Sequence, residues 1–188
     1  MTMQTDDPQG TDDSQGADAS RRADYRAIFD FIAKIGLDIR EASLPDDTFL
    51  PGIVLREGGL LVDPQKLRWP GDLLHEAGHL AVLPADVRPQ AHDDAPEVEG
   101  IAHAGELEAM AWAYAAAVEL GLPMERLIHE GGYRGKSREL LQMYAFGVYP
   151  GLRGLCESGM TAAPGFASGA DDVGDDIRYP RMRHWLRG

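Results

Sequence analysis

His75-Glu76-Ala77-Gly78-His79 is the stretch of this 188-residue chain that says most about its fold. On a helix, positions i and i+4 lie on one face, one turn apart. His75 and His79 can therefore bind the same metal ion, with zinc–nitrogen bonds of about 2.0–2.1 Å. Glu76 lies beside them and can act as general base toward a metal-bound water. The pattern predicts a helix with a Zn²⁺ site on one face and Glu76 as the catalytic residue.

The flanking sequence supports a helix around this motif. Pro70 and Asp72 are typical of a first helical turn, and Pro84 ends the apolar pattern. Gly78 costs about 1 kcal/mol relative to Ala within a helix, so it indicates close approach of another backbone or of a metal site. The alternative is a pair of buried, hydrogen-bonded histidines without a metal.

The rest of the chain predicts an α+β fold. A helical pattern begins at Ser20 and ends near Ile35, and two β-prone runs at 52–56 and 60–63 surround a Gly-rich turn. Further helices are predicted at about 105–120, 123–130 and 137–146, followed by loops with one or two short helical turns. We therefore expect a mostly helical, zincin-like domain over residues 20–188, with a small antiparallel sheet or hairpin before the H-E-x-x-H helix.

Composition limits the possible functions. Residues 1–19 contain five aspartates, no basic residue and few apolar side chains, so we expect a disordered acidic tail and no secretory signal. No apolar run approaches the length of a membrane span. Cys156 is the only cysteine, which excludes an internal disulfide and favours a cytoplasmic location. A net charge of −13 argues against direct nucleic-acid binding.

A catalytic zinc usually has three protein ligands and an open position. The class with a third His six residues after the motif is excluded, because Ala85 occupies that position. The predicted helix at 105–120 offers Glu106, Glu108 and Glu119. Glu108 flanks the apolar stripe of this helix, whereas Glu106 lies about 160° away around the axis. We therefore expect Glu108 to be the third ligand, with an exposed first-turn carboxylate as the alternative reading. The apolar stripe consists of Leu107, Met110, Ala111, Tyr114 and Val118.

The segment Glu108-Ala109-Met110-Ala111-Trp112-Ala113 resembles the E-A-x-x-F-A helix of the ImmA/IrrE metallopeptidases. That family places H-E-x-G-H just after a hairpin and the glutamate helix some thirty residues later, and Glu108 lies twenty-nine residues after His79. The resemblance covers roughly residues 50–123. It departs from the family at the end of the glutamate helix and in the residues that lead into the motif, and no helix-turn-helix is present. It implies a zinc peptidase acting on a cytoplasmic protein or peptide, with a transcriptional regulator as one candidate.

We therefore expect a zinc metalloendopeptidase with His75, His79 and Glu108 as ligands. Tyr133 and His129 are candidates for stabilising the oxyanion, as are Tyr144 and His103, although no spacing singles one out. A strand of the hairpin could bind an extended peptide by edge pairing. Two alternatives remain: a zinc-binding interaction module with little or no peptidase activity, and a metal-free helical regulatory protein.

Overall fold

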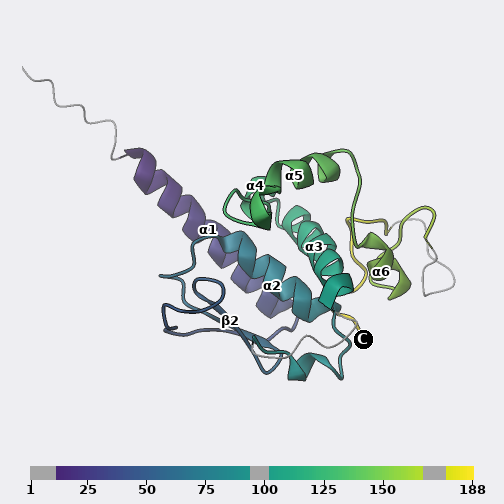
Figure 1. Cartoon of the computed structure of the whole chain (residues 1–188), viewed down its shortest axis with the longest axis horizontal. Coiled ribbons are helices and arrows are strands. Elements are labelled where there is room, and N and C mark those ends of the chain that lie inside the picture. The colour runs from purple at the N-terminus through teal and green to yellow at the C-terminus, as the bar shows by residue number, and fades with distance from the viewer. Residues whose placement is uncertain (1–11, 94–101, 167–176) are drawn as a thin grey trace, which may run out of the picture.

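A computed structural model describes residues 12–93, 102–166 and 177–188 of the chain (Figure 1). Its fold is α+β, with helices around a small mixed sheet. The elements are α1 (Asp12–Lys34), β1 (Ile39–Glu41), β2 (Ile53–Arg56), β3 (Gly59–Val62), α2 (Pro70–Val82), the short 3-10 helix η1 (Arg88–Gln90), α3 (Ala102–Glu119), α4 (Met124–Leu127), the short 3-10 helix η2 (Tyr133–Gly135), α5 (Ser137–Ala145) and α6 (Leu152–Glu157). Within these ranges, no helix combines the length and the apolar character needed to cross a membrane.

The sheet contains the predicted hairpin and one strand that the sequence did not predict. β2 and β3 pair antiparallel, with Ile53 opposite Val62, around the turn at Glu57 and Gly58. β1 pairs parallel to β3, which places β3 in the centre of the sheet. The hairpin leads into α2, as the sequence analysis predicts. β1 is only three residues long, too short to give an alternating pattern that could be recognised.

α1 begins eight residues before Ser20, so the predicted helix start is wrong. Asp18 explains part of the extension, because its carboxylate forms ion pairs with Arg21 and Arg22, three and four residues later on the helix. Ser20 is not a cap; its hydroxyl accepts a hydrogen bond from Arg126 at 2.8 Å. Of the predicted acidic tail, residues 12–19 belong to α1, and residues 1–11 lie outside the described part of the chain.

The core lies where α2 packs between α1 and α3. Ile28 and Ile32 of α1, Leu73 and Leu80 of α2, and Trp112 of α3 are fully buried. The indole N–H of Trp112 donates to the carbonyl of Trp185 at 2.8 Å. The C-terminal segment is therefore part of the same core, although it contains no helix or strand in residues 177–188.

α2 and α3 approach each other closely at Gly78. A Cβ atom at this position would lie 2.6 Å from the backbone oxygen of Ala109. Only a residue without a side chain permits this separation, which confirms the close backbone approach inferred from the sequence. The two helices that the motif and its expected glutamate occupy are thus held face to face.

The outer edge of β2 is already paired. The backbone N–H of Asp93 donates to the carbonyl of Leu55 at 3.2 Å, and the N–H of Leu55 donates to the Asp93 carboxylate at 3.1 Å. The N–H of Gly58 donates to the carbonyl of Ala91 at 3.0 Å. Residues 91–93 therefore lie along the strand edge where an extended peptide was expected to bind.

Candidate metal centre

The helix that holds the two histidines begins in the way the sequence predicts. Trp69 is the extended N-cap residue, Pro70 begins α2, and Asp72 lies in the first turn, where a carboxylate is stabilised by the helix dipole. The α2 residues Leu73, Leu74, Ala77, Gly78, Leu80 and Ala81 are buried. This packing fixes the helix about its axis and directs the imidazoles toward α3.

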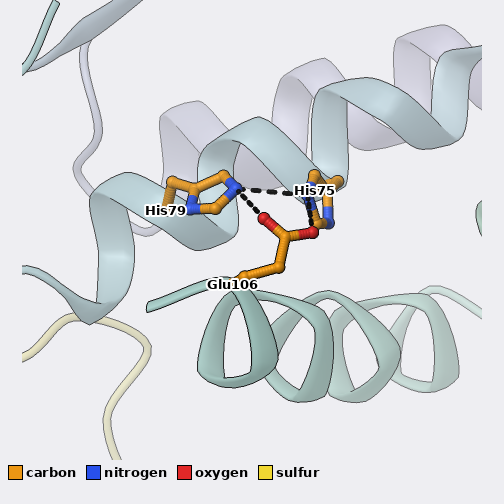
Figure 2. Close-up of side chains that lie close together, drawn as sticks. All are labelled: His75, His79 and Glu106. Carbon is orange, nitrogen blue, oxygen red and sulfur yellow. Dashed lines mark hydrogen bonds and ion pairs between the residues drawn. The ribbon is translucent and has the colours of Figure 1, made fainter. Parts of the chain in front are cut away.

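His75 and His79 meet one turn apart on this face (Figure 2). Their Nε2 atoms are 3.1 Å apart, and the rings are nearly perpendicular, with centroids separated by 4.7 Å. Both side chains are partly shielded, with exposed fractions of 14% for His75 and 30% for His79. The pair is therefore reachable from solvent but lies mostly inside the helix interface.

A carboxylate from α3 completes the group, and it belongs to Glu106 (Figure 2). One oxygen of Glu106 lies 3.3 Å from Nε2 of His75, and the other lies 3.3 Å from Nε2 of His79. Ligand atoms about 2.0–2.1 Å from a tetrahedral zinc ion lie about 3.3 Å from one another. The two Nε2 atoms are close to this spacing, each carboxylate oxygen is at this distance from one imidazole, and one ligand atom from each residue lies within 4.8 Å of the others. Two imidazoles and a carboxylate are donors that suit zinc.

The structure does not bring Glu108, the residue chosen from the sequence, to the histidines. Its carboxylate instead accepts a hydrogen bond from Arg187 at 2.7 Å and lies against Gly154 of α6. The physical reason is helical geometry: residues two apart point in nearly opposite directions. The partly buried side of α3 at Glu108 faces α6, whereas the side at Glu106 faces α2.

One signal in the sequence could have identified Glu106. Gly78 needs a small, close partner on the facing helix, and α3 offers alanines at 109, 113 and 116, spaced by three and four residues. Glu106 precedes Ala109 by three residues and therefore lies on this same face. Small residues line the side of α3 that packs against α2. The broad apolar stripe lies on another side, so it did not identify the face that meets α2.

Burial and charge set the protonation of the group. Hydrogen bonds from His75 and His79 hold the pKa of Glu106 well below its usual value. Burial lowers the pKa of His75, but the hydrogen bond to Glu106 and the charges of Glu106, Glu76 and Asp72 outweigh it, so the net pKa is raised. Without a metal, the three side chains form a hydrogen-bonded group of one carboxylate and two imidazoles. This is the alternative to a metal site, and the same geometry serves both.

Glu76 has the properties required of a proton acceptor. Burial raises the pKa of its carboxyl, and the neighbouring charges of His79 and His75 lower it in part. A carboxylate that is partly desolvated is a stronger base than one in water. Glu76 interacts electrostatically with both histidines without being one of the three grouped donors.

The candidate oxyanion donors Tyr133, Tyr144 and His103 differ in their surroundings. Tyr133 lies edge-on to His75 at 6.3 Å between ring centroids, and its hydroxyl donates to the carbonyl of Leu127 at 3.0 Å. Tyr144 packs against Tyr114 and Tyr149 in an aromatic cluster. The side chain of His103 lies outside the described part of the chain.

His129 forms a buried unit with the start of α2. Its Nε2 lies 2.8 Å from the carboxylate of Asp72, and its ring stacks on Trp69 with centroids 4.5 Å apart. Asp72 is three residues before His75 and so lies on the same side of α2. In the sequence, Trp69 and Asp72 indicate only a helix start, because nothing in the local pattern shows that a histidine 57 residues after Asp72 packs against them.

Comparison of the chain with protein-family models, curated proteins and solved structures found no match.

Proposed function

We propose that the protein is a zinc-dependent metallopeptidase whose ligands are His75, His79 and Glu106. The observation that supports this most strongly is the position of the Glu106 carboxylate: one of its oxygens lies 3.3 Å from Nε2 of His75, and the other lies 3.3 Å from Nε2 of His79. Two histidines and a glutamate leave a fourth position open, as in catalytic zinc sites and unlike closed structural ones. This proposal replaces Glu108 with Glu106 as the third ligand.

The division of roles follows from the positions of the residues. A zinc ion held by His75, His79 and Glu106 would lower the pKa of a bound water and would polarise the carbonyl of the substrate. Glu76 accepts the proton of the attacking water and delivers it to the leaving amine. The raised pKa of Glu76 suits both steps, because a carboxyl must hold the proton between them. The substrate is a peptide bond in a protein or peptide, and a transcriptional regulator remains one candidate.

A second candidate function is a zinc-binding interaction module with little or no peptidase activity. Two observations favour it: the hydroxyl of Tyr133 and Nε2 of His129 are both engaged within the protein, and residues 91–93 cover part of the β2 edge. On this reading the same three ligands bind zinc without turnover. Glu76 favours the peptidase, because a zinc site without catalysis needs no general base.

Substrate trapping separates the two candidates. A tagged Glu76→Ala variant is loaded with zinc and used to capture proteins from a lysate, and each captured protein is then incubated with the wild type. The peptidase proposal predicts a cut product with the wild type and none with the variant. Captured proteins that remain intact with zinc-loaded wild type, together with no cleavage of a broad peptide library, would support the interaction module instead.

A further inference from the structure

Arg187 contacts both helices of the proposed metal centre. Its guanidinium donates to the Glu108 carboxylate of α3 at 2.7 Å. Its backbone N–H donates to the carbonyl of Ala81 at the end of α2, at 2.9 Å. Ala81 is two residues after His79, and Glu108 is two residues after Glu106. One residue of the C-terminal segment thus connects the turns that hold two of the three proposed ligands.

The contact with α3 is closely fitted. The side chains of Arg187 and Glu108 are 23% and 17% exposed, so the pair is mostly removed from water. Glu108 lies in a space that exists only because residue 154 is a glycine: a Cβ there would fall 1.6 Å from a Glu108 oxygen. The close approach of α6 and the guanidinium together leave the Glu108 side chain little freedom, and this restricts rotation of the first described turns of α3.

The contact with α2 is reinforced by a second arginine. The guanidinium of Arg88 donates to the carbonyls of Leu80 and Leu83 at 2.8 and 3.0 Å, and to the carbonyl of Arg187 at 2.7 Å. The last carbonyls of a helix have no partner within it, so these bonds satisfy the end of α2 and anchor residue 187 there. The backbone of Arg187 is therefore fixed on α2 whatever its side chain does.

We propose that Arg187 is a positioning residue: through Glu108 it sets the rotation of α3 relative to α2, so that the Glu106 carboxylate faces both imidazoles. This inference rests on the proposed function only in taking His75, His79 and Glu106 as the ligands. Glu106 and Glu108 are two residues apart and point to nearly opposite sides of α3. A contact that holds Glu108 against α6 therefore also fixes the direction in which Glu106 faces α2. Outer residues that orient a ligand typically change metal affinity by about 10–100-fold when replaced.

The test is the zinc affinity of matched variants, measured by competition with a chelating indicator. Arg187→Met removes the charge but keeps the backbone contacts to α2. We expect it to weaken zinc binding roughly tenfold, Glu108→Gln to do the same, and the double variant to be no weaker than either single one. Arg187→Lys, which keeps a cation, should recover part of the affinity. Arg153→Met breaks an exposed ion pair with Glu157 on α6 and should change nothing.

The melting temperature of each metal-free variant is measured alongside, so that loss of fold is separated from loss of ligand orientation. If Arg187→Met fails to fold, the zinc affinities of Glu108→Gln and Arg187→Lys still decide. The positioning role predicts a roughly tenfold loss for Glu108→Gln and a smaller loss for Arg187→Lys. Wild-type affinity in both Arg187→Met and Glu108→Gln, or an additive loss in the double variant, overturns the positioning role. Absence of zinc binding by the wild type itself would instead overturn the proposed function on which this inference rests.

Discussion

At the scale of single residues, the proposed function gives Glu76 and Glu106 different tasks, although both are carboxylates near the same imidazoles. Glu106 accepts hydrogen bonds from both histidines, which lowers its pKa and keeps it anionic, as a ligand must be. Glu76 has a raised pKa because it is buried, as a proton carrier requires. Environment rather than residue type assigns the roles, and the two can be separated by substitution.

Glu76→Gln should retain zinc and abolish peptide cleavage. The amide preserves the shape of the side chain but cannot accept a proton, so only the acid–base step is lost. The measurements are zinc content and cleavage of a peptide library by wild type and variant. Cleavage by the variant at the wild-type rate would show that Glu76 is not the base.

Glu106→Gln should weaken zinc binding by more than the roughly 10–100-fold that is typical of outer-shell substitutions, because it removes an anionic ligand. Glu108→Gln should show the smaller loss expected of a positioning residue. Glu119→Gln, at the opposite end of α3 and exposed, is the control and should bind zinc like the wild type. A greater loss from Glu108→Gln than from Glu106→Gln would restore the ligand assignment first made from the sequence.

At the scale of elements, the packing of α2 against α3 brings the three donors together. Helix periodicity in the sequence predicted α2, most of α3 and α5, because proline and glycine residues near their ends interrupt the patterns. It could not say which side of α3 meets α2, because that depends on the neighbour each side packs against. The sequence therefore favoured Glu108, whereas the structure places Glu106 beside the histidines and Glu108 beside Arg187. Gly78 marked a close contact, and the alanines at 109, 113 and 116 were the signal on α3 that could have identified the face it contacts.

Gly78→Ala should destabilise the protein by about 1–3 kcal/mol, the usual cost of overpacking. The added Cβ would lie 2.6 Å from the backbone oxygen of Ala109, so the two helices must separate. Urea unfolding of the metal-free protein measures the effect. Gly16→Ala in α1 is the matched control: nothing lies within 4 Å of its Cβ, so alanine should stabilise by roughly 0.5–1 kcal/mol. Equal stabilisation by both substitutions would exclude the close contact.

At the scale of the whole molecule, the C-terminal segment joins the site to the core. Trp185 packs edge-on against Phe31 and Trp112, with ring centroids 4.9 and 5.6 Å away. Two residues later, Arg187 binds Ala81 near the end of α2 and Glu108 in the first half of α3. From the sequence, only loops with one or two short helical turns were predicted after residue 146, because contacts between residues 70 or more positions apart leave no local pattern. The stacking of Trp69 on His129, which are 60 positions apart, leaves no local pattern either. The strand β1 was missed because it is only three residues long.

The metal-free protein should lose stability as the pH rises through the pKa of His75. A group whose pKa is raised in the folded state stabilises the fold below its unfolded-state pKa of about 6.5, and this contribution disappears above the folded-state pKa. The pKa of His75 is raised in this way. Melting temperatures are measured in the presence of a chelator. For the wild type they should fall as the pH rises from about 6 to above the folded-state pKa of His75. For His75→Gln they should fall less over the same range. An identical pH profile for both proteins would contradict the ion pair with Glu106.

The central claim is that His75, His79 and Glu106 are the ligands of one zinc ion. A crystal structure of the zinc-loaded protein, with anomalous diffraction measured at the zinc edge, tests it most directly. We predict one anomalous peak with Nε2 of both histidines and an oxygen of Glu106 at about 2.0–2.2 Å. Zinc bound by Glu108 in place of Glu106, or no peak between α2 and α3, would contradict the account.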